Sequence, residues 1–195
     1  MIDFKNLEAY IINRLTNELS DKLLYHNLNH TLYVTSSAET IAKKEKLDKK
    51  SIELIKTAAL FHDLGYIKQY NNNEPIATLE AIEALPKFGY EQGDILLVCK
   101  MIMATSIKVT PNNLLEYIIC DADHYYFGDQ DVSIIANNLR KEMENYNIYY
   151  SDIDWLKLQI KYLEKHKYYT ETAIKSREHQ KQAYIKFLKT QLNEQ

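Results

Sequence analysis

Apolar residues recur at the spacing of an α-helix through most of this chain, and few residues interrupt the pattern. The first run places Phe4, Leu7, Ile11 and Leu15 on one helical face. The 195 residues include only 4 Gly and 3 Pro, which leaves little material for the tight turns that join β-strands. Hydrophobic residues make up 46% of the chain, enough to bury one sizeable core. The sequence therefore predicts an all-α protein.

Capping residues and prolines set the expected helix boundaries. Asp48, Ser151 and Thr170 are residue types that accept hydrogen bonds at helix N-termini. Pro75 suits the first position of a helix, and Thr110-Pro111 suits a cap followed by a first position. We expect helices over residues 4–19, from His30, from Asp48 to His62-Asp63, from Pro75 to about Leu85, across Ile95 to Met103, from Thr110 to Asp123, over 131–144, from Ser151 with Asp154 as its capping-box partner, and from Thr170 towards Leu192.

Nothing in the composition divides the chain or directs it to a membrane. No run of about 18 apolar residues is present to span a bilayer, and the N-terminal segment is amphipathic and charged throughout. A formal net charge of -3 does not favour nucleic acid as a partner, although nine Lys and Arg oppose four Glu from Leu156 onward. We expect one domain over residues 1–195, located in the cytoplasm, and the oligomeric state stays open.

The stretch TAALFHDLGY, residues 57–66, is an apolar helical run that ends in two residue types able to bind a metal. His62 and Asp63 would lie at the end of a buried helix, next to the backbone freedom of Gly65. An imidazole and a carboxylate on adjacent residues reach one divalent cation only where the helix ends or bends. A His-Asp pair alone is a weak signal, so further ligands are needed.

Such partners stand before and after the pair, each at the end of an apolar periodic run. YHNLNHT precedes it at residues 25–31, and CDAD follows at 120–123. The ordered set of His, His-Asp and Asp resembles the HD superfamily of metal-dependent phosphohydrolases, in particular its small single-domain bacterial members. The resemblance runs from about Tyr25 to Phe127. It implies an HD-domain helical bundle with its core at about 25–127 and with flanking N- and C-terminal helices.

The resemblance also implies a set of site residues and a cofactor. Two imidazoles with two carboxylates suit one divalent ion such as manganese, iron, cobalt, nickel, zinc or magnesium, and leave positions open for water and a phosphate oxygen. Asp63 would also orient or deprotonate the water, as a catalytic residue. Carried over by position, the metal ligands are His30, His62, Asp63 and Asp123, while His26 and Asp121 would either support these ligands from behind or face the substrate.

Other candidates follow from their chemistry. Glu74, His26 and Lys68 lie in or near the expected mouth of the site, where one of them would protonate the leaving group or contact the substrate. Arg177 is a candidate for a bidentate phosphate contact, because the guanidinium group matches phosphate oxygens. Sixteen tyrosines could supply a surface on which a nucleobase stacks.

One departure from the family pattern bears on the number of metals. Two-metal HD enzymes carry additional histidines between the His-Asp pair and the last aspartate, whereas this chain has none from Asn71 through Asp123. We therefore expect one metal ion. The leading function is a metal-dependent phosphohydrolase acting on a small phosphorylated metabolite or nucleotide. The alternatives are a non-catalytic nucleotide-binding HD module and an HD-type di-iron oxygenase.

Overall fold

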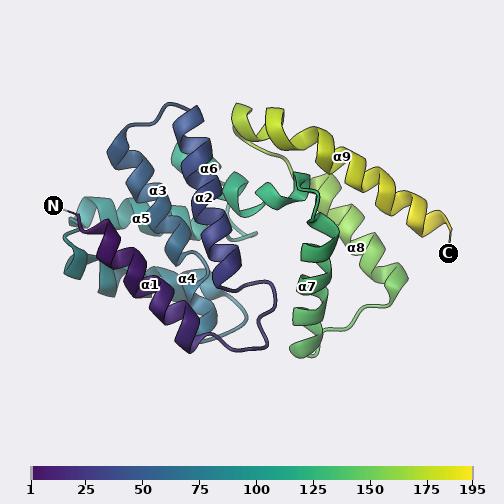
Figure 1. Cartoon of the computed structure of the whole chain (residues 1–195), viewed down its shortest axis with the longest axis horizontal. Coiled ribbons are helices and arrows are strands. Elements are labelled where there is room, and N and C mark those ends of the chain that lie inside the picture. The colour runs from purple at the N-terminus through teal and green to yellow at the C-terminus, as the bar shows by residue number, and fades with distance from the viewer. Residues whose placement is uncertain (1, 195) are drawn as a thin grey trace.

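The computed structural model describes residues 2–194, and in this range it contains helices and no strand (Figure 1). The predicted all-α class is confirmed. Three short 3-10 helices, η1 to η3, join the longer elements. In chain order the helices are α1 (Phe4–Glu18), α2 (Leu28–Lys44), α3 (Lys49–Phe61), η1 (Leu64–Ile67), α4 (Asn73–Ala84), η2 (Leu85–Phe88), α5 (Gln92–Ala104), α6 (Leu114–Asp123), η3 (Tyr125–Gly128), α7 (Val132–Asn145), α8 (Asp152–Lys165) and α9 (Glu171–Asn193).

Three helices begin where their capping residues predict. The side chain of Asp48 accepts a hydrogen bond from the backbone N–H of the third residue of α3, and Ser151 and Thr170 do the same for α8 and α9. Each bond satisfies an N–H group that has no partner within its own helix. These starts were predictable because the interaction joins residues only three positions apart.

Two predicted starts are wrong because an asparagine caps the helix instead. The helix α2 begins at Leu28 rather than at His30, since the side chain of Asn27 accepts hydrogen bonds from two N–H groups of the first turn. Likewise, α6 begins at Leu114 rather than at Thr110, since Asn113 caps it. His30 consequently lies inside the first turn of α2, where its side chain is fixed by regular helical backbone.

The predicted start of α4 is also wrong. This helix begins at Asn73, after Asn72 in the left-handed conformation with φ of 53°, so Pro75 occupies the third helical position and not the first. Proline is tolerated there because N–H groups of the first turn have no carbonyl partner within the helix. The shift brings the Asn73 side chain into the buried interior.

The helix α2 lies in the middle of the N-terminal part of the bundle and packs against α3 and α6 (Figure 1). Its inward face carries Val34, Ala38 and Ile41, which are fully buried, and Ala58 and Ala59 of α3 are fully buried as well. Small side chains at such contacts let the helices approach closely. As a result, the start of α2 and the ends of α3 and α6 meet at one place.

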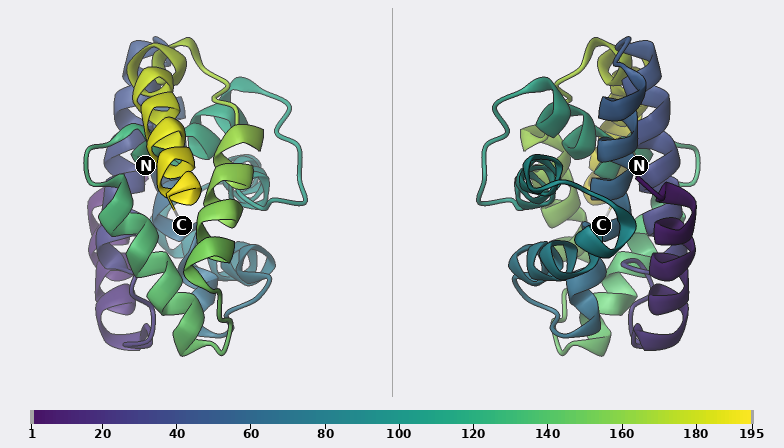
Figure 2. Two further views of the ribbon diagram at one scale, coloured as in Figure 1. Left: turned by 90° about the vertical axis from the view of Figure 1, so that its right-hand side faces the viewer. Right: turned by 90° about the vertical axis from the view of Figure 1, so that its left-hand side faces the viewer.

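The helices α7, α8 and α9 form the other side of the molecule (Figures 1 and 2). The long helix α9 packs along α8 and over η3, while α7 contacts η3. In Figure 1, α7 and α8 diverge from one another. No helix of the described range is long and apolar enough to cross a bilayer.

Candidate metal centre

The four predicted ligands come from three helices and converge on one point. His30 lies in the first turn of α2, His62 and Asp63 directly follow α3, and Asp123 is the last residue of α6. His62 Nε2 lies 3.4 Å from His30 Nε2 and 3.1 Å from Asp63 Oδ2. Asp123 Oδ1 lies 3.2 Å from His30 Nε2 and 3.6 Å from His62 Nε2. Ligand atoms at about 2.1 Å from a first-row cation stand roughly 3.0 to 3.4 Å apart, so these separations fit one ion.

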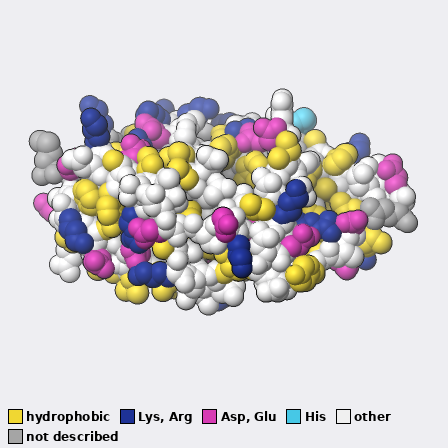
Figure 3. All heavy atoms as spheres, turned by 60° about the horizontal axis from the view of Figure 1, so that its bottom comes forward, with side chains coloured by type: hydrophobic (Ala, Val, Ile, Leu, Met, Phe, Trp, Pro, Cys, Tyr) yellow, Lys and Arg dark blue, Asp and Glu magenta, His cyan; other side chains and the backbone are white. Residues whose placement is uncertain are grey.

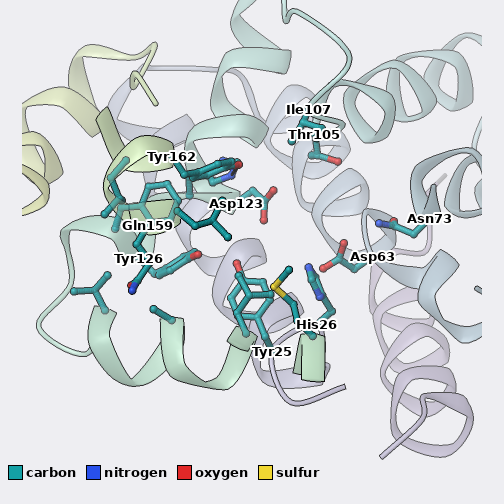
Figure 4. A pocket seen from close by; sticks show the side chains of 18 of the residues that line it. Tyr25, His26, Asp63, Asn73, Thr105, Ile107, Asp123, Tyr126, Gln159 and Tyr162 are labelled. Carbon is teal, nitrogen blue, oxygen red and sulfur yellow. Dashed lines mark hydrogen bonds between the residues drawn. The ribbon is translucent and has the colours of Figure 1, made fainter. Parts of the chain in front are cut away.

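Three of the four residues form the tightest group. The ligand atoms of His30, His62 and Asp123 all lie within 4.8 Å of one another. Asp63 is outside this mutual set, although its Oδ2 is close to both imidazoles, at 3.1 Å from His62 Nε2 and 3.4 Å from His30 Nε2. Figure 4 shows the Asp63 and Asp123 carboxylates facing the same space from two sides.

Local structure fixes how His62 and Asp63 point. His62 Nδ1 donates a hydrogen bond to the Ala59 carbonyl at 2.7 Å, which leaves the Nε2 lone pair of a neutral ring directed at the cluster. Gly65 brings η1 against α4: a Cβ atom at this glycine would stand 2.0 Å from the Asn73 carbonyl oxygen. The glycine is therefore required by close packing, and not by the backbone freedom that the sequence suggested.

The electrostatics of the cluster favour positive charge at its centre. Burial by itself would lower the pKa of His62, yet Asp63 and Asp123 raise it well above its ordinary value. Burial would raise the pKa of both carboxyl groups, yet the neighbouring histidines hold the pKa of Asp63 and of Asp123 below the usual range. The carboxylates are thus ionised and direct a negative field into the site.

Two buried acceptor atoms test whether the residues present suit a cation. Asp63 Oδ2 and Asn73 Oδ1 are buried and accept no hydrogen bond from the protein. A buried polar atom without a partner costs about 1 to 3 kcal/mol, so such atoms in a native protein call for an explanation. Together with two imidazoles and a second carboxylate, Asp63 Oδ2 fits a divalent cation.

A cavity of about 320 Å³ opens beside the cluster (Figure 4). Asp63 and Asp123 lie on its wall, and so does the partly buried Glu74, as the sequence analysis expected for a residue near the mouth. Asn73 and the ring of His124 also face it. Most of the remaining wall is aromatic or aliphatic and comes from η3, α7, α8 and α9.

His26 lines the same cavity and is held by a residue that sequence reasoning missed. Glu142 of α7 is completely buried, and its carboxylate pairs with His26 Nδ1 and accepts the backbone N–H groups of Tyr25 and His26 at 2.8 and 2.9 Å. His26 Nε2 lies 3.1 Å from the Tyr66 hydroxyl. Burial would lower the pKa of His26, but Glu142 raises it. The sequence does hold one sign of this role, because Glu142 precedes the apolar Met143 on the inward side of α7.

Two other predicted site residues, Lys68 and Arg177, do not line the cavity. Lys68 is exposed and pairs with Glu80 at 2.5 Å on another face of η1 and α4. Arg177 pairs with Asp129 at 2.8 Å and lies over the ring of Tyr125. Their charges are therefore already engaged, in contacts that lie outside the cavity wall.

Asp121 also points away from the cavity, because it anchors the start of α9. It is fully buried and accepts hydrogen bonds from the backbone N–H groups of Tyr169 and Thr170 at 2.8 Å and from the Thr170 hydroxyl at 2.7 Å. Burial raises the pKa of Asp121 to about 6 against these hydrogen bonds. Its position two residues before Asp123 puts it on the opposite side of α6.

Comparison with known proteins agrees with this geometry. The family model for the HD domain matches residues 27–128, which is more than half of the chain. No curated protein sequence matches. The crystal structure of a predicted HD superfamily hydrolase from an uncultured Thermotogales bacterium superposes with a TM-score of 0.64 over 95% of this chain and 91% of that one, at 24% sequence identity. That likeness shows the helical fold. With the matched segment spanning every residue of the metal cluster, the chain belongs to the HD domain family.

Proposed function

We propose that this HD domain protein is a metal-dependent phosphohydrolase that acts on a small phosphorylated metabolite or nucleotide. The observation that carries the proposal is that Asp63 and Asp123, which share a cluster with the buried His30 and His62, line a cavity large enough for a small ligand. Two imidazoles and two carboxylates beside a cavity suit hydrolysis, because such a donor set would hold a divalent cation close to a substrate in the cavity.

His30, His62, Asp63 and Asp123 would hold a divalent cation, which would supply Lewis acidity towards a phosphoryl oxygen and make water a better nucleophile. The protein contributes the orientation of the reacting groups. Asp63, whose Oδ2 accepts no hydrogen bond from the protein, would help hold the cation and would also orient or deprotonate the attacking water. Asn73 Oδ1, which is also buried and unpaired, is a second acceptor on the same wall.

His26 is the residue best placed to protonate the leaving group. Glu142 fixes its ring through Nδ1 and, against the effect of burial, raises its pKa. Both His26 and Glu74 line the cavity, so Glu74 stays a second candidate for this role. Glu142 does not line the cavity and acts by positioning His26.

A screen for phosphate release tests the proposal. Purified protein loaded with manganese, cobalt or nickel is assayed against nucleoside mono-, di- and triphosphates, cyclic nucleotides and phosphate monoesters. We expect turnover that disappears on chelation and returns with metal, and that is lost in His62→Ala. Metal binding without turnover of any ester would indicate the non-catalytic binding module. Oxygen consumption by a protein with two irons would indicate the oxygenase.

A further inference from the structure

The cavity has an apolar arm that extends from the metal cluster between α7 and α8. On α7, the side chains that line it are four apolar residues at helical spacing, namely Val132, Ala136, Leu139 and Met143. On α8, the side chains are Trp155, Leu158, Gln159, Tyr162 and Leu163. Both sets follow one face of their helix, so two largely apolar stripes border the same space.

Two pairs of polar groups in this arm are engaged with one another. The Tyr184 hydroxyl donates a hydrogen bond to Gln159 Oε1 at 3.1 Å, and the Tyr162 hydroxyl lies 3.0 Å from His124 Nε2. A sugar or a nucleobase buried there would lose hydrogen bonds to water and would find few free partners. An unpaired buried polar group costs about 1 to 3 kcal/mol, so the arm disfavours such ligands.

Lysine and arginine are missing from the wall as well. Among the described residues that line the cavity there is no Lys and no Arg. The exposed Lys165 and Lys167 belong to a neighbouring hollow of about 280 Å³, on the far side of Tyr162 and His124. On the face shown in Figure 3, basic and acidic side chains are interspersed. The arm therefore offers no counter-charge for a second or third phosphate group.

From these observations we propose that the ligand is the monophosphate ester of an apolar alcohol, an aryl or alkyl group, whose carbon skeleton fills the arm between α7 and α8. This inference rests on the proposed phosphohydrolase function. Hydrolysis forms a bond from the water oxygen to phosphorus and breaks the bond from phosphorus to the alcohol oxygen, which takes up a proton. The apolar alcohol and inorganic phosphate are the products. A cavity of about 320 Å³ suits a single ring or a short chain.

The chain contains one tryptophan, Trp155, and it lies on the wall of the arm, so its fluorescence reports whether the arm is filled. Methyl-, butyl-, hexyl- and phenylphosphonate share one head group, and their carbon–phosphorus bond is not an ester bond. Binding to the metal-loaded protein is followed by Trp155 fluorescence and by calorimetry. We expect affinity to rise about fourfold per added methylene until the arm is full, with a fluorescence change for the longer members.

Two variants with the same substitution separate filling of the arm from a general effect of added bulk. Ala136→Leu places a larger side chain in the arm, and Ala183→Leu places it on the exposed side of α9. We expect Ala136→Leu to weaken phenylphosphonate at least tenfold while methylphosphonate binds as before, and Ala183→Leu to change neither. If circular dichroism shows that Ala136→Leu is unfolded, Leu139→Ala serves instead, because it enlarges the arm and shifts the best alkyl group to a longer one.

The outcomes distinguish this inference from the proposed function. Equal affinity for methyl- and phenylphosphonate, or a Trp155 signal that ignores chain length, overturns the apolar ligand even if polar phosphate esters are hydrolysed. Chain-length-dependent binding without turnover of phenyl or alkyl phosphates upholds the ligand class and overturns the hydrolase. Chain-length-dependent binding together with faster release of phosphate from phenyl phosphate than from glycerol phosphate supports both.

Discussion

Among single side chains, Asp63 is one whose substitution should affect turnover far more than stability. Its Oδ2 is buried but accepts no hydrogen bond from the protein, and asparagine keeps the size and shape of the side chain. We expect Asp63→Asn to lower turnover about 100-fold or more and to change the free energy of unfolding by about 1 kcal/mol or less. Phosphate release and urea unfolding measure the two effects.

The matched control is Asp94→Asn, which changes another buried aspartate that pairs with Lys50 far from the cavity. It should keep its turnover. If Asp63→Asn retained normal turnover with its metal content verified, the hydrolytic role of this cluster would be wrong.

The pair of His26 and Glu142 predicts a pH-dependent stability. The pKa of His26 is raised above 6.5, so its contribution is complete below that pH and is lost as pH rises through the folded value. The pKa of Glu142 is lowered below 4.5, so its contribution is complete above that pH and is lost as pH falls through the folded value. The pair therefore stabilises most between pH 4.5 and 6.5.

Glu142→Gln should consequently destabilise the protein by about 3 kcal/mol near pH 5.5 and by clearly less near pH 9. Urea unfolding at both pH values measures this difference, with the nearby Glu144→Gln as control. The same loss at both pH values would show that Glu142 contributes through packing and backbone hydrogen bonds alone.

Among the helical elements, the contact of η1 with α4 sets the position of the metal ligands that precede it. A Cβ atom at Gly65 would meet the backbone of Asn73, which cannot give way without moving α4. We expect Gly65→Ala to destabilise the protein by about 2 kcal/mol or more and to weaken metal binding, measured by thermal unfolding and by metal titration.

Gly93 provides the opposite case within the same chain. It lies in the first turn of α5, and a Cβ atom there would meet nothing within 4 Å. Gly93→Ala should stabilise the protein by about 0.4 to 1 kcal/mol, because alanine restricts the unfolded chain. Equal effects of the two substitutions would contradict the close packing inferred at Gly65.

For the whole molecule, metal binding joins the start of α2 to the ends of α3 and α6. Among residues 2–194, two imidazoles belong to the cluster, since the His26 ring is engaged with Glu142 and Tyr66 and the His124 ring with Cys120 and Tyr162. We expect one tightly bound metal per chain, and a ligand at 100 times its Kd adds about 2.7 kcal/mol to stability. Elemental analysis after dialysis and Tm with and without chelator test this. About two irons per chain would contradict it.

Interactions between residues near in sequence were largely predictable. The caps Asp48, Ser151 and Thr170 act over three positions, so residue type alone indicated them. Asn27 and Asn113 act over the same distance and were missed, because proline and histidine nearby gave competing signals. The types of the metal ligands and their order along the chain were also visible in the sequence. Adjacent His and Asp residues reach one ion only at the end of a helix, and the apolar run before His62 indicated such an end.

The sequence by itself determined that this chain is helical, that it resembles the HD family, and which four side chains are candidates to share a cation. These properties depend on helical periodicity and on residue types at short spacing. Only the tertiary structure decided which charged groups remain free for a ligand. Arg177 and Lys68 pair with Asp129 and Glu80, and Glu142 reaches His26 from the other side of the molecule. The apolar arm likewise exists only because α7 and α8 meet the metal cluster in space, a proximity that no local pattern encodes.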